Sequence, residues 1–204
     1  IDSLITDSGY LISVLADPNG ETYQTLDDES SWGYWTSSYV GTNSSYDVDD
    51  RLTWVAGIET SASTVQGVID GTSQTSVFSG YVLGAVSNGS NVYPILFDGN
   101  NNVSLSFEFG GGSAALSGSI AFHTSNSQQW NATIEGTGTS TTFSGTASNN
   151  TSASNIVITS GSLDGKYFGT GSIKSVGGKF NLSDGTNDAV GVFKANSAGR
   201  GQME

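Results

Sequence analysis

Short stretches of alternating apolar and polar residues, separated by clusters of turn residues, fill the sequence from about Leu52 onward. The pattern is clearest between Asn102 and Phe109, where every second residue is apolar: Val103, Leu105, Phe107 and Phe109. A period of two is typical of a strand with one buried face. Glycine and asparagine between the stretches supply the positive φ angles that tight hairpins need. The pattern therefore predicts an all-β, antiparallel chain.

The same alternation predicts further strands along the chain. They are Leu52–Ile58, Thr64–Ile69, Ser76–Val86, Val92–Phe97, Leu116–Phe122, Trp130–Ile134, Phe143–Ala147, Asn155–Leu163, Gly178–Leu182 and Ala189–Phe193. No comparable helical stretch is expected after residue 30. Because proline cannot donate a ladder hydrogen bond, Pro94 predicts an edge strand, a bulge or a strand end.

Two features favour a barrel over a β-sandwich. Glycines recur on the faces expected to point inward, where they let a sheet bend sharply: Gly80, Gly84, Gly118 and Gly145. The last strand, Ala189–Phe193, can pair with a strand near the tryptophan-rich beginning and so remove the open edges. We therefore predict an antiparallel up-and-down β-barrel of about eight strands, with a sandwich as the alternative.

The pattern also predicts a division of the chain. Residues 1–30 are expected to be an N-terminal extension or linker with a leading strand or short helix. Residues 31–197 are expected to form the β-barrel domain, and residues 198–204 a C-terminal tail. The sequence starts at Ile1 without a basic and apolar leader segment, so we expect a part of a longer exported protein.

Charge is sparse and one-sided in this chain. Only 12% of the residues are charged, and 19 acidic residues against six basic ones give a net charge of −13. Nucleic acid and anionic membranes require a basic footprint, so neither is expected as a partner. A basic protein or a metal ion is compatible with this charge. The chain has no cysteine and no apolar run long enough to span a bilayer as a helix, so no membrane insertion by this chain is expected.

The last forty residues carry the most specific motifs. These are Gly165–Gly169 (GKYFG), Val176–Leu182 (VGGKFNL) and Val190–Ala195 (VGVFKA). Together they resemble the closing segment of the barrel domain of bacterial transferrin-binding protein B and its lipoprotein relatives. Upstream, Trp32–Trp35 (WGYW) is similar to the tryptophan motif that opens the barrel in many of those relatives. The resemblance covers about Ser31 to Ala195.

The sequence departs from the family pattern at three places. Thr170 follows Gly169 where the family has proline, Lys174–Val176 replaces an acidic position, and Lys194 replaces the last glycine. A lipobox cysteine is absent from the sequence. The resemblance implies the barrel fold rather than one ligand. It implies a non-enzymatic module, extracellular or at the cell surface and associated with a bacterial outer membrane, that presents loops to a host protein or a small ligand.

Four residues are candidates for ligand binding. Trp35 would be an aromatic anchor pointing away from the core, and the alternative is a packed tryptophan. His123, at a strand end, would be a metal or haem ligand or a general base, and the alternative is a solvent-facing histidine in a turn. Asp49 and Asp50 lie in an oxygen-rich segment that suits Ca²⁺, and the alternative is a solvated turn.

No cofactor, metal site or catalytic residue is predicted. The segment Asp98–Asn101 is also rich in oxygen ligands, but neither this segment nor Asp47–Asp50 matches the twelve-residue calcium loop. Paired carboxylates for glycoside hydrolysis would have to come from Glu59, Glu108 or Glu135, on or at the ends of predicted strands. A binding protein is therefore favoured over an enzyme. The second alternative is a structural spacer domain within a larger bacterial adhesin or surface protein.

Overall fold

The computed structural model describes residues 3–5, 11–15, 29–40, 45–150 and 154–197, with side chains described for 29–33, 53–150 and 154–197. These residues form two antiparallel sheets and one helix. The smaller sheet has the strand order β1 (Ser3–Ile5), β2 (Leu11–Leu15), β3 (Ser30–Val40) and β4 (Ser45–Gly57). The part predicted as an extension thus contributes β1 and β2 to this smaller sheet, which it shares with β3 and β4.

The larger sheet closes on itself as a barrel. Its strands follow one another around the barrel as β5 (Gln74–Ser87), β7 (Asn102–Gly110), β8 (Ser113–His123), β9 (Gln129–Gly138), β10 (Thr142–Asn149), β11 (Ser160–Phe168), β12 (Ser175–Ser183) and β13 (Asp188–Ser197). A ninth strand, β6 (Val92–Pro94), pairs with the end of β5. The predicted antiparallel barrel of about eight strands is confirmed.

The barrel closes between its first and last strands. β13 pairs with β5 over ten residue pairs, from Asp188 opposite Ser87 to Ser197 opposite Phe78. The expectation that the last strand would pair near the tryptophan-rich segment is wrong, because that segment lies in β3 of the other sheet. The predicted domain boundaries of 1–30, 31–197 and 198–204 stay a prediction, and the eight barrel strands lie within residues 74–197.

Inward-facing glycines make the closure sterically possible. A Cβ atom at Gly80 would lie 1.9 Å from the carbonyl oxygen of Lys194, and one at Gly84 would lie 2.2 Å from that of Val190. Any side chain at these two positions would push β5 away from β13. Glycine therefore serves the bending role that the sequence pattern predicted for it.

Aromatic side chains fill the barrel lumen. Phe107 lies at the centre of one group, with ring centroids 5.0 Å from Phe143, 5.5 Å from Phe109, 5.6 Å from Tyr167 and 5.7 Å from Phe78. All five side chains are buried. The predicted inward row of β7 is thereby confirmed, and the interior is packed as a core rather than left as a channel.

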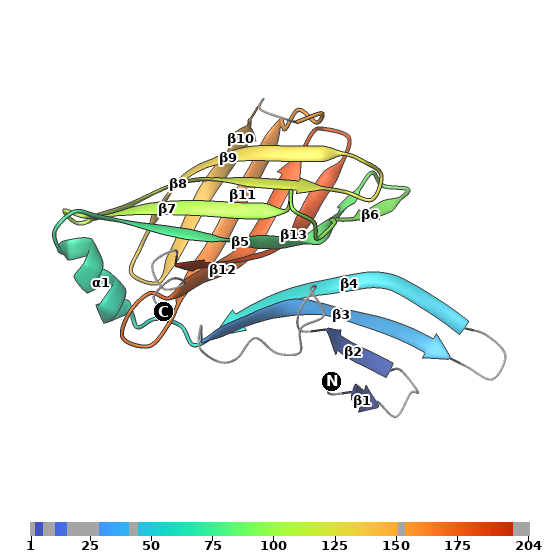
Figure 1. Cartoon of the computed structure of the whole chain (residues 1–204), viewed down its shortest axis with the longest axis horizontal. Helices are drawn as coiled ribbons and strands as arrows, with labels where there is room; N and C mark the ends of the chain where they lie inside the picture. Colours follow the sequence, from blue (N-terminus) through green and yellow to red (C-terminus); the bar gives the residue numbers. More distant parts are fainter. Residues whose placement is uncertain (1–2, 6–10, 16–28, 41–44, 151–153, 198–204) are drawn as a thin grey trace.

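A short helix covers one end of the barrel, where the sequence pattern predicted a strand over Thr64–Ile69. α1 (Ala62–Asp70) begins after Ser61, whose side chain accepts a hydrogen bond from the Thr64 amide at 3.2 Å. Val65 and Ile69, four residues apart, are both buried on one helical face. The prediction was wrong because the β-branched residues of this segment also favour strands. Figure 1 shows α1 at one end of the barrel.

Two further strands are observed at positions or lengths that differ from the predicted ones. The strand predicted over Asn155–Leu163 is observed as β11 at Ser160–Phe168, so its first five residues are not in a strand. The strand predicted over Val92–Phe97 is reduced to β6, after which Ile95 forms only an isolated bridge with Thr124. Pro94 ends this edge strand, as predicted for a residue that cannot donate to a ladder.

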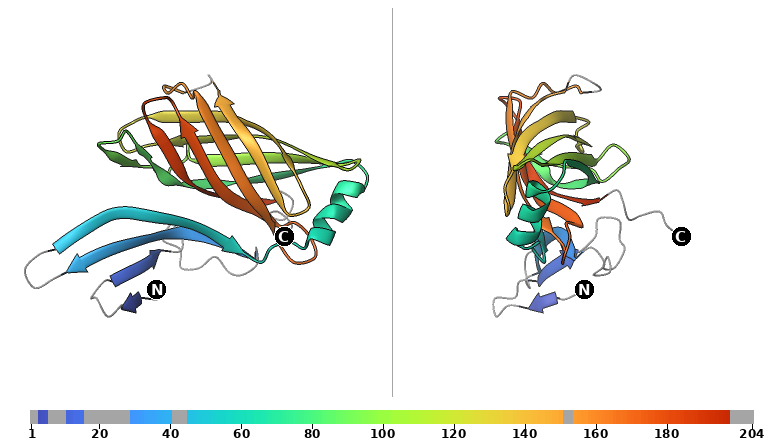
Figure 2. Two further views of the ribbon diagram at one scale, coloured as in Figure 1. Left: turned by 180° about the vertical axis from the view of Figure 1, so that it is seen from behind. Right: turned by 90° about the vertical axis from the view of Figure 1, so that its left-hand side faces the viewer.

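The smaller sheet lies along the outer wall of the barrel (Figures 1 and 2). Trp32 of β3 is 8% exposed and packs with Leu83 of β5 and Val192 of β13, while Val55 of β4 and Phe97 contact the same cluster. Both β5 and β13 therefore have an apolar patch on the outer face as well as an inward row. Among the described residues, no helix combines the length and apolar character needed to cross a bilayer.

Glu29 fixes the start of β3 to the barrel. Its backbone adopts a left-handed conformation (φ 56°), and its carbonyl oxygen accepts a hydrogen bond from the Ile58 amide at 2.8 Å. Lys174 Nζ donates to Glu29 Oε1 at 2.8 Å, and the Thr170 amide donates to the other carboxylate oxygen. These hydrogen bonds from Lys174 and Thr170 hold the pKa of the Glu29 carboxyl below its usual value.

Candidate functional site

Strand β5 changes its partner along one edge. It pairs with β7 from Gln74 to Gly80 and with β6 from Ala85 to Ser87, while the opposite edge pairs continuously with β13 from Phe78 onward. Residues 81–84 lie between the two pairings. The barrel wall is therefore interrupted at this place, where β7 diverges from β5.

The Asn101 side chain closes the bottom of this interruption. Its Oδ1 accepts a hydrogen bond from the Val82 amide at 2.9 Å, and its Nδ2 donates to the carbonyl oxygens of Val82 and Leu96, each at 2.9 Å. Asn101 is only 2% exposed. The amide thus replaces the missing strand neighbour of Val82, because buried backbone groups need hydrogen-bond partners.

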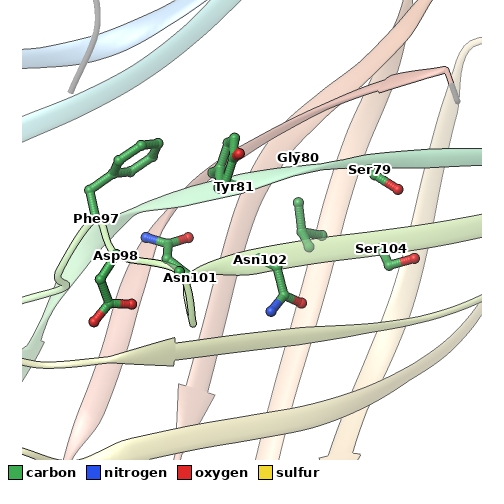
Figure 3. A pocket seen from close by; sticks show the side chains of 10 residues that line it. Ser79, Gly80, Tyr81, Phe97, Asp98, Asn101, Asn102 and Ser104 are labelled. Carbon is green, nitrogen blue, oxygen red and sulfur yellow. The ribbon is translucent and has the colours of Figure 1, made fainter. Parts of the chain in front are cut away.

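An open cleft of about 650 Å³ lies over this interruption on the outer wall. Its lining residues are Ser79, Gly80, Tyr81, Phe97, Asp98, Gly99, Asn101, Asn102, Val103 and Ser104. Figure 3 shows Tyr81 and Phe97 on one side of the cleft, Asn101 between the strands, and Asp98 and Asn102 on the other side. The cleft therefore combines aromatic, amide, hydroxyl and carboxylate groups.

The aromatic side of the cleft is held in place from behind. The Tyr81 and Phe97 rings have centroids 4.8 Å apart with an interplanar angle of 52°, and Phe97 lies 6.4 Å from the Trp32 ring. Tyr81 is 44% exposed. Among the residues with described side chains, no other aromatic residue is as exposed. A rigid aromatic ring open to solvent is a common anchor in protein interfaces.

Asp98 lies at the polar end of the cleft, next to His123. Asp98 Oδ1 accepts a hydrogen bond from the Asn100 amide at 2.8 Å, and Asp98 Oδ2 lies 3.7 Å from His123 Nδ1. The Asn100 side-chain nitrogen lies 3.3 Å from the same imidazole nitrogen. His123, a predicted candidate, therefore lies beside the cleft without lining it.

The other predicted binding residues fall outside the described side chains. Trp35 belongs to β3 and Asp49 and Asp50 to β4, but only their backbone is described, so their proposed roles stay predictions. Within the described part of the chain, no three histidine, cysteine or acidic side chains are grouped so that they could hold a metal ion. The oxygen-rich segment Asp98–Asn101 is a turn closed by its own hydrogen bonds.

The three glutamates considered for glycoside hydrolysis are exposed on separate strands or loops. Glu108 is on β7 and Glu135 on β9, while Glu59 follows β4 and accepts a hydrogen bond from Lys166 Nζ at 2.5 Å. None of the three lines the cleft at β5 and β7. Glu108 and Glu135 lie on either side of β8, opposite Ala115 and Ser117, and neither these two nor Glu59 lines one of the clefts of the described residues.

A second cleft, of about 480 Å³, lies between β4 and the strands β10 to β12. Its basic residues already have acidic neighbours: Lys166 with Glu59 at 2.5 Å and Lys179 with Asp164 at 3.9 Å. The remaining lining is dominated by glycine backbone and by the apolar side chains of Val55, Phe143 and Phe168. Because its charged groups face each other, we regard the cleft at β5 and β7 as the better candidate.

Sequence reasoning missed Tyr81 and Phe97 in this cleft, and it named Asn101 only as part of the oxygen-rich segment Asp98–Asn101. One signal for Tyr81 was present, because it lies between the inward-facing Gly80 and Val82 and so had to be an aromatic residue on the outer face. No comparable signal existed for Asn101. Its role depends on where β7 leaves β5, and that divergence is a property of the tertiary structure.

The sequence matches no family model and no curated protein. Solved structures of transferrin binding protein B share its fold. The protein from serogroup B Neisseria meningitidis aligns with a TM-score of 0.58 at 18% identity, covering 96% of this chain and 35% of that one. The vaccine antigen from Haemophilus parasuis Hp5 gives 0.60 at 17% identity, covering 96% and 37%. Intact Ap-TbpB, with its N and C lobes, gives 0.64 at 15% identity, also covering 96% and 37%.

The chain spans little more than a third of the length of each of these proteins. Within that third, the shared fold is the one that the sequence resemblance implied. The motif segments that carried the resemblance lie at the end of β11, within β12 and within β13. They are the strands that complete and close the barrel, so their sequence similarity reflects the requirements of closure.

Proposed function

We propose that this chain is a non-enzymatic binding module, located outside the cell or on its surface. It contacts a partner protein through the cleft between β5 and β7 and the loops beside that cleft. The observation that carries the proposal is Tyr81, an exposed aromatic ring backed by Phe97 in an open cleft. Exposed aromatic residues with rigid support contribute much of the binding energy in protein interfaces.

The packed lumen favours binding of the partner on the outer wall of the barrel. Because Phe107, Phe143 and their neighbours occupy the interior, a small molecule has no preformed space there. The fold supports the same proposal by analogy, since the solved proteins that share it are named for binding transferrin. Transferrin is therefore the first partner to test.

Surface plasmon resonance with the immobilised chain tests the proposal. Purified transferrin, iron-loaded and iron-free, is passed over it first, followed by other serum proteins and iron and haem carriers. We expect saturable binding to at least one of these, weakened in a Tyr81→Leu variant. The matched control is Val77→Ala, which alters another exposed apolar residue of the same strand outside the cleft.

If none of these proteins binds to the folded chain on the chip, the result would contradict the binding function and favour the spacer alternative. The location needs its own measurement. Protease digestion of intact cells that express the full-length protein should cleave it if it is displayed at the surface. Protection in intact cells, followed by cleavage after lysis, would contradict the surface location.

A further inference from the structure

The cleft at β5 and β7 has one aromatic side that is both exposed and rigid. The exposed Tyr81 ring lies 4.8 Å from Phe97, which in turn contacts the buried Trp32. These contacts restrict the Tyr81 ring before any ligand arrives, so little conformational entropy remains to be lost on binding. An aromatic face of this kind attracts apolar groups and cations.

A carboxylate lies in the same cleft, directly after Phe97 in the sequence. The Asp98 side chain is 37% exposed, with the Asn100 amide bound to one carboxylate oxygen and His123 Nδ1 lying 3.7 Å from the other. A carboxylate can accept about four hydrogen bonds, so these contacts leave capacity for a further donor. The Asx turn also fixes the direction of the carboxylate.

Basic side chains are absent from the lining of this cleft, which otherwise has hydroxyl and amide groups such as those of Ser79, Ser104 and Asn102. Lys194 of β13 pairs with Tyr81 across the β5–β13 ladder, but its side chain is buried, with only 5% of the residue exposed. The whole chain adds to the negative potential. Its net charge is −13, and the residues before Gln74 alone hold twelve acidic residues and one basic residue.

We propose that this cleft binds an arginine side chain of the partner protein. The inference rests on the proposed function and specifies the chemistry of its contact. A guanidinium is planar, stacks on aromatic rings and donates paired hydrogen bonds to a carboxylate, so it matches both sides of the cleft. The acidic chain attracts a basic surface, and the hydroxyl and amide groups of the lining satisfy its remaining donors.

An NMR titration with N-acetyl-arginine amide tests this proposal without knowledge of the partner. We expect saturable shifts of the backbone amides of Tyr81, Asp98 and Asn102 in the ¹⁵N-labelled protein. The matched probe is N-acetyl-citrulline amide, which has nearly the same shape but no charge. It should bind about fivefold more weakly, because the charge-assisted contacts are lost.

Two variants assign the contacts. Asp98→Asn keeps an oxygen for the Asx turn while removing the charge, and it should weaken arginine binding by about fivefold. Tyr81→Leu keeps an apolar side chain without the ring, and it should weaken binding by about threefold. Asp188→Asn, at an exposed carboxylate of β13 outside the cleft, is the control and should leave the affinity unchanged.

Equal binding of citrulline, or equal losses in Asp98→Asn and Asp188→Asn, would overturn the proposal. So would shifts at these amides with a methyl glycoside but not with arginine, because the cleft would then be a sugar site. A positive plasmon resonance result with a negative arginine titration defeats this inference alone. A silent protein panel with a positive arginine titration contradicts the proposed protein-binding function and leaves the arginine specificity of the cleft standing.

Discussion

Aromatic residues serve opposite purposes in the lumen and on the outer wall of this barrel. In the lumen, Phe107 is surrounded by four other aromatic rings, and none of these side chains is accessible. On the outer wall, Tyr81 has one ring neighbour at 4.8 Å and leaves 44% of its surface to solvent. Close packing on all sides stabilises the fold, whereas support from one side leaves a surface for recognition.

The two regions are separated by a single step along β5. Val82 points into the lumen and is fully buried, while its neighbour Tyr81 points outward into the cleft. The backbone of Val82 also contacts Asn101, which closes the cleft from below. The comparison therefore predicts that substitutions a few ångströms apart affect stability and binding separately.

Phe107→Ala should have the largest effect on stability. It removes a fully buried ring from the centre of the aromatic group, and such truncations lower the free energy of unfolding by about 3–5 kcal/mol. Urea denaturation followed by tryptophan fluorescence measures the loss. A loss below about 1 kcal/mol would show that the lumen is not closely packed, and the comparison with the outer wall would fail.

Asn101→Ala should follow with a loss of about 2–3 kcal/mol, because it removes the hydrogen bonds to the buried backbone groups of Val82 and to the partly buried carbonyl of Leu96. Hydrogen exchange of the Val82 amide should become faster. The matched control, Asn102→Ala, removes an exposed neighbouring amide and should change stability by less than about 0.5 kcal/mol. Equal losses in the two variants would disprove the strand-replacing role of Asn101.

The sequence predicted the lumen well and the cleft poorly. The alternation of Val103 to Phe109 is sufficient to assign an inward face, because strand geometry alone decides which side chains share a face. The cleft depends on the loop that precedes β7 and on a change of strand partner along β5, which no local pattern encodes. The helix α1 was missed for a related reason: Val65 and Ile69 are β-branched, and only packing against the barrel end selects the helix.

Tyr167→Phe should raise the free energy of unfolding by about 1 kcal/mol. The Tyr167 side chain is 1% exposed, and its hydroxyl has no hydrogen-bond partner among the described residues. Removing an unsatisfied buried polar group relieves its desolvation cost. A loss of stability in this variant would instead mean that the hydroxyl binds a partner such as an internal water.

The same variant has a signature at alkaline pH. Burial raises the pKa of the Tyr167 hydroxyl above its usual value. As the pH rises, the Tyr167 hydroxyl therefore ionises in the unfolded chain before it ionises in the folded one. The free energy of unfolding keeps its full value below the unfolded pKa of about 10 and falls as the pH rises above it. Denaturation curves between neutral and alkaline pH should show a smaller decline in Tyr167→Phe than in the unmodified protein.

Tyr81→Leu should have the smallest effect on stability, below about 0.5 kcal/mol, because the side chain is exposed and remains apolar. Its effect on partner binding should nevertheless exceed that of Phe107→Ala measured under conditions where both proteins are folded. A large loss of stability in Tyr81→Leu would erase the distinction between the two regions, since the ring would then be part of the core.

The seam between β5 and β13 is the last strand pairing of the barrel that can form during synthesis. Every other neighbouring pair in the barrel is joined within a short stretch of chain, whereas the seam unites residues more than 100 positions apart, such as Ser87 and Asp188. Contacts of this range form late, and β13 is also the last barrel strand to leave the ribosome. Until then the nascent sheet exposes two unpaired edges that can join other chains. A nascent chain that stops within its final strand is therefore expected to aggregate, not to form a smaller barrel.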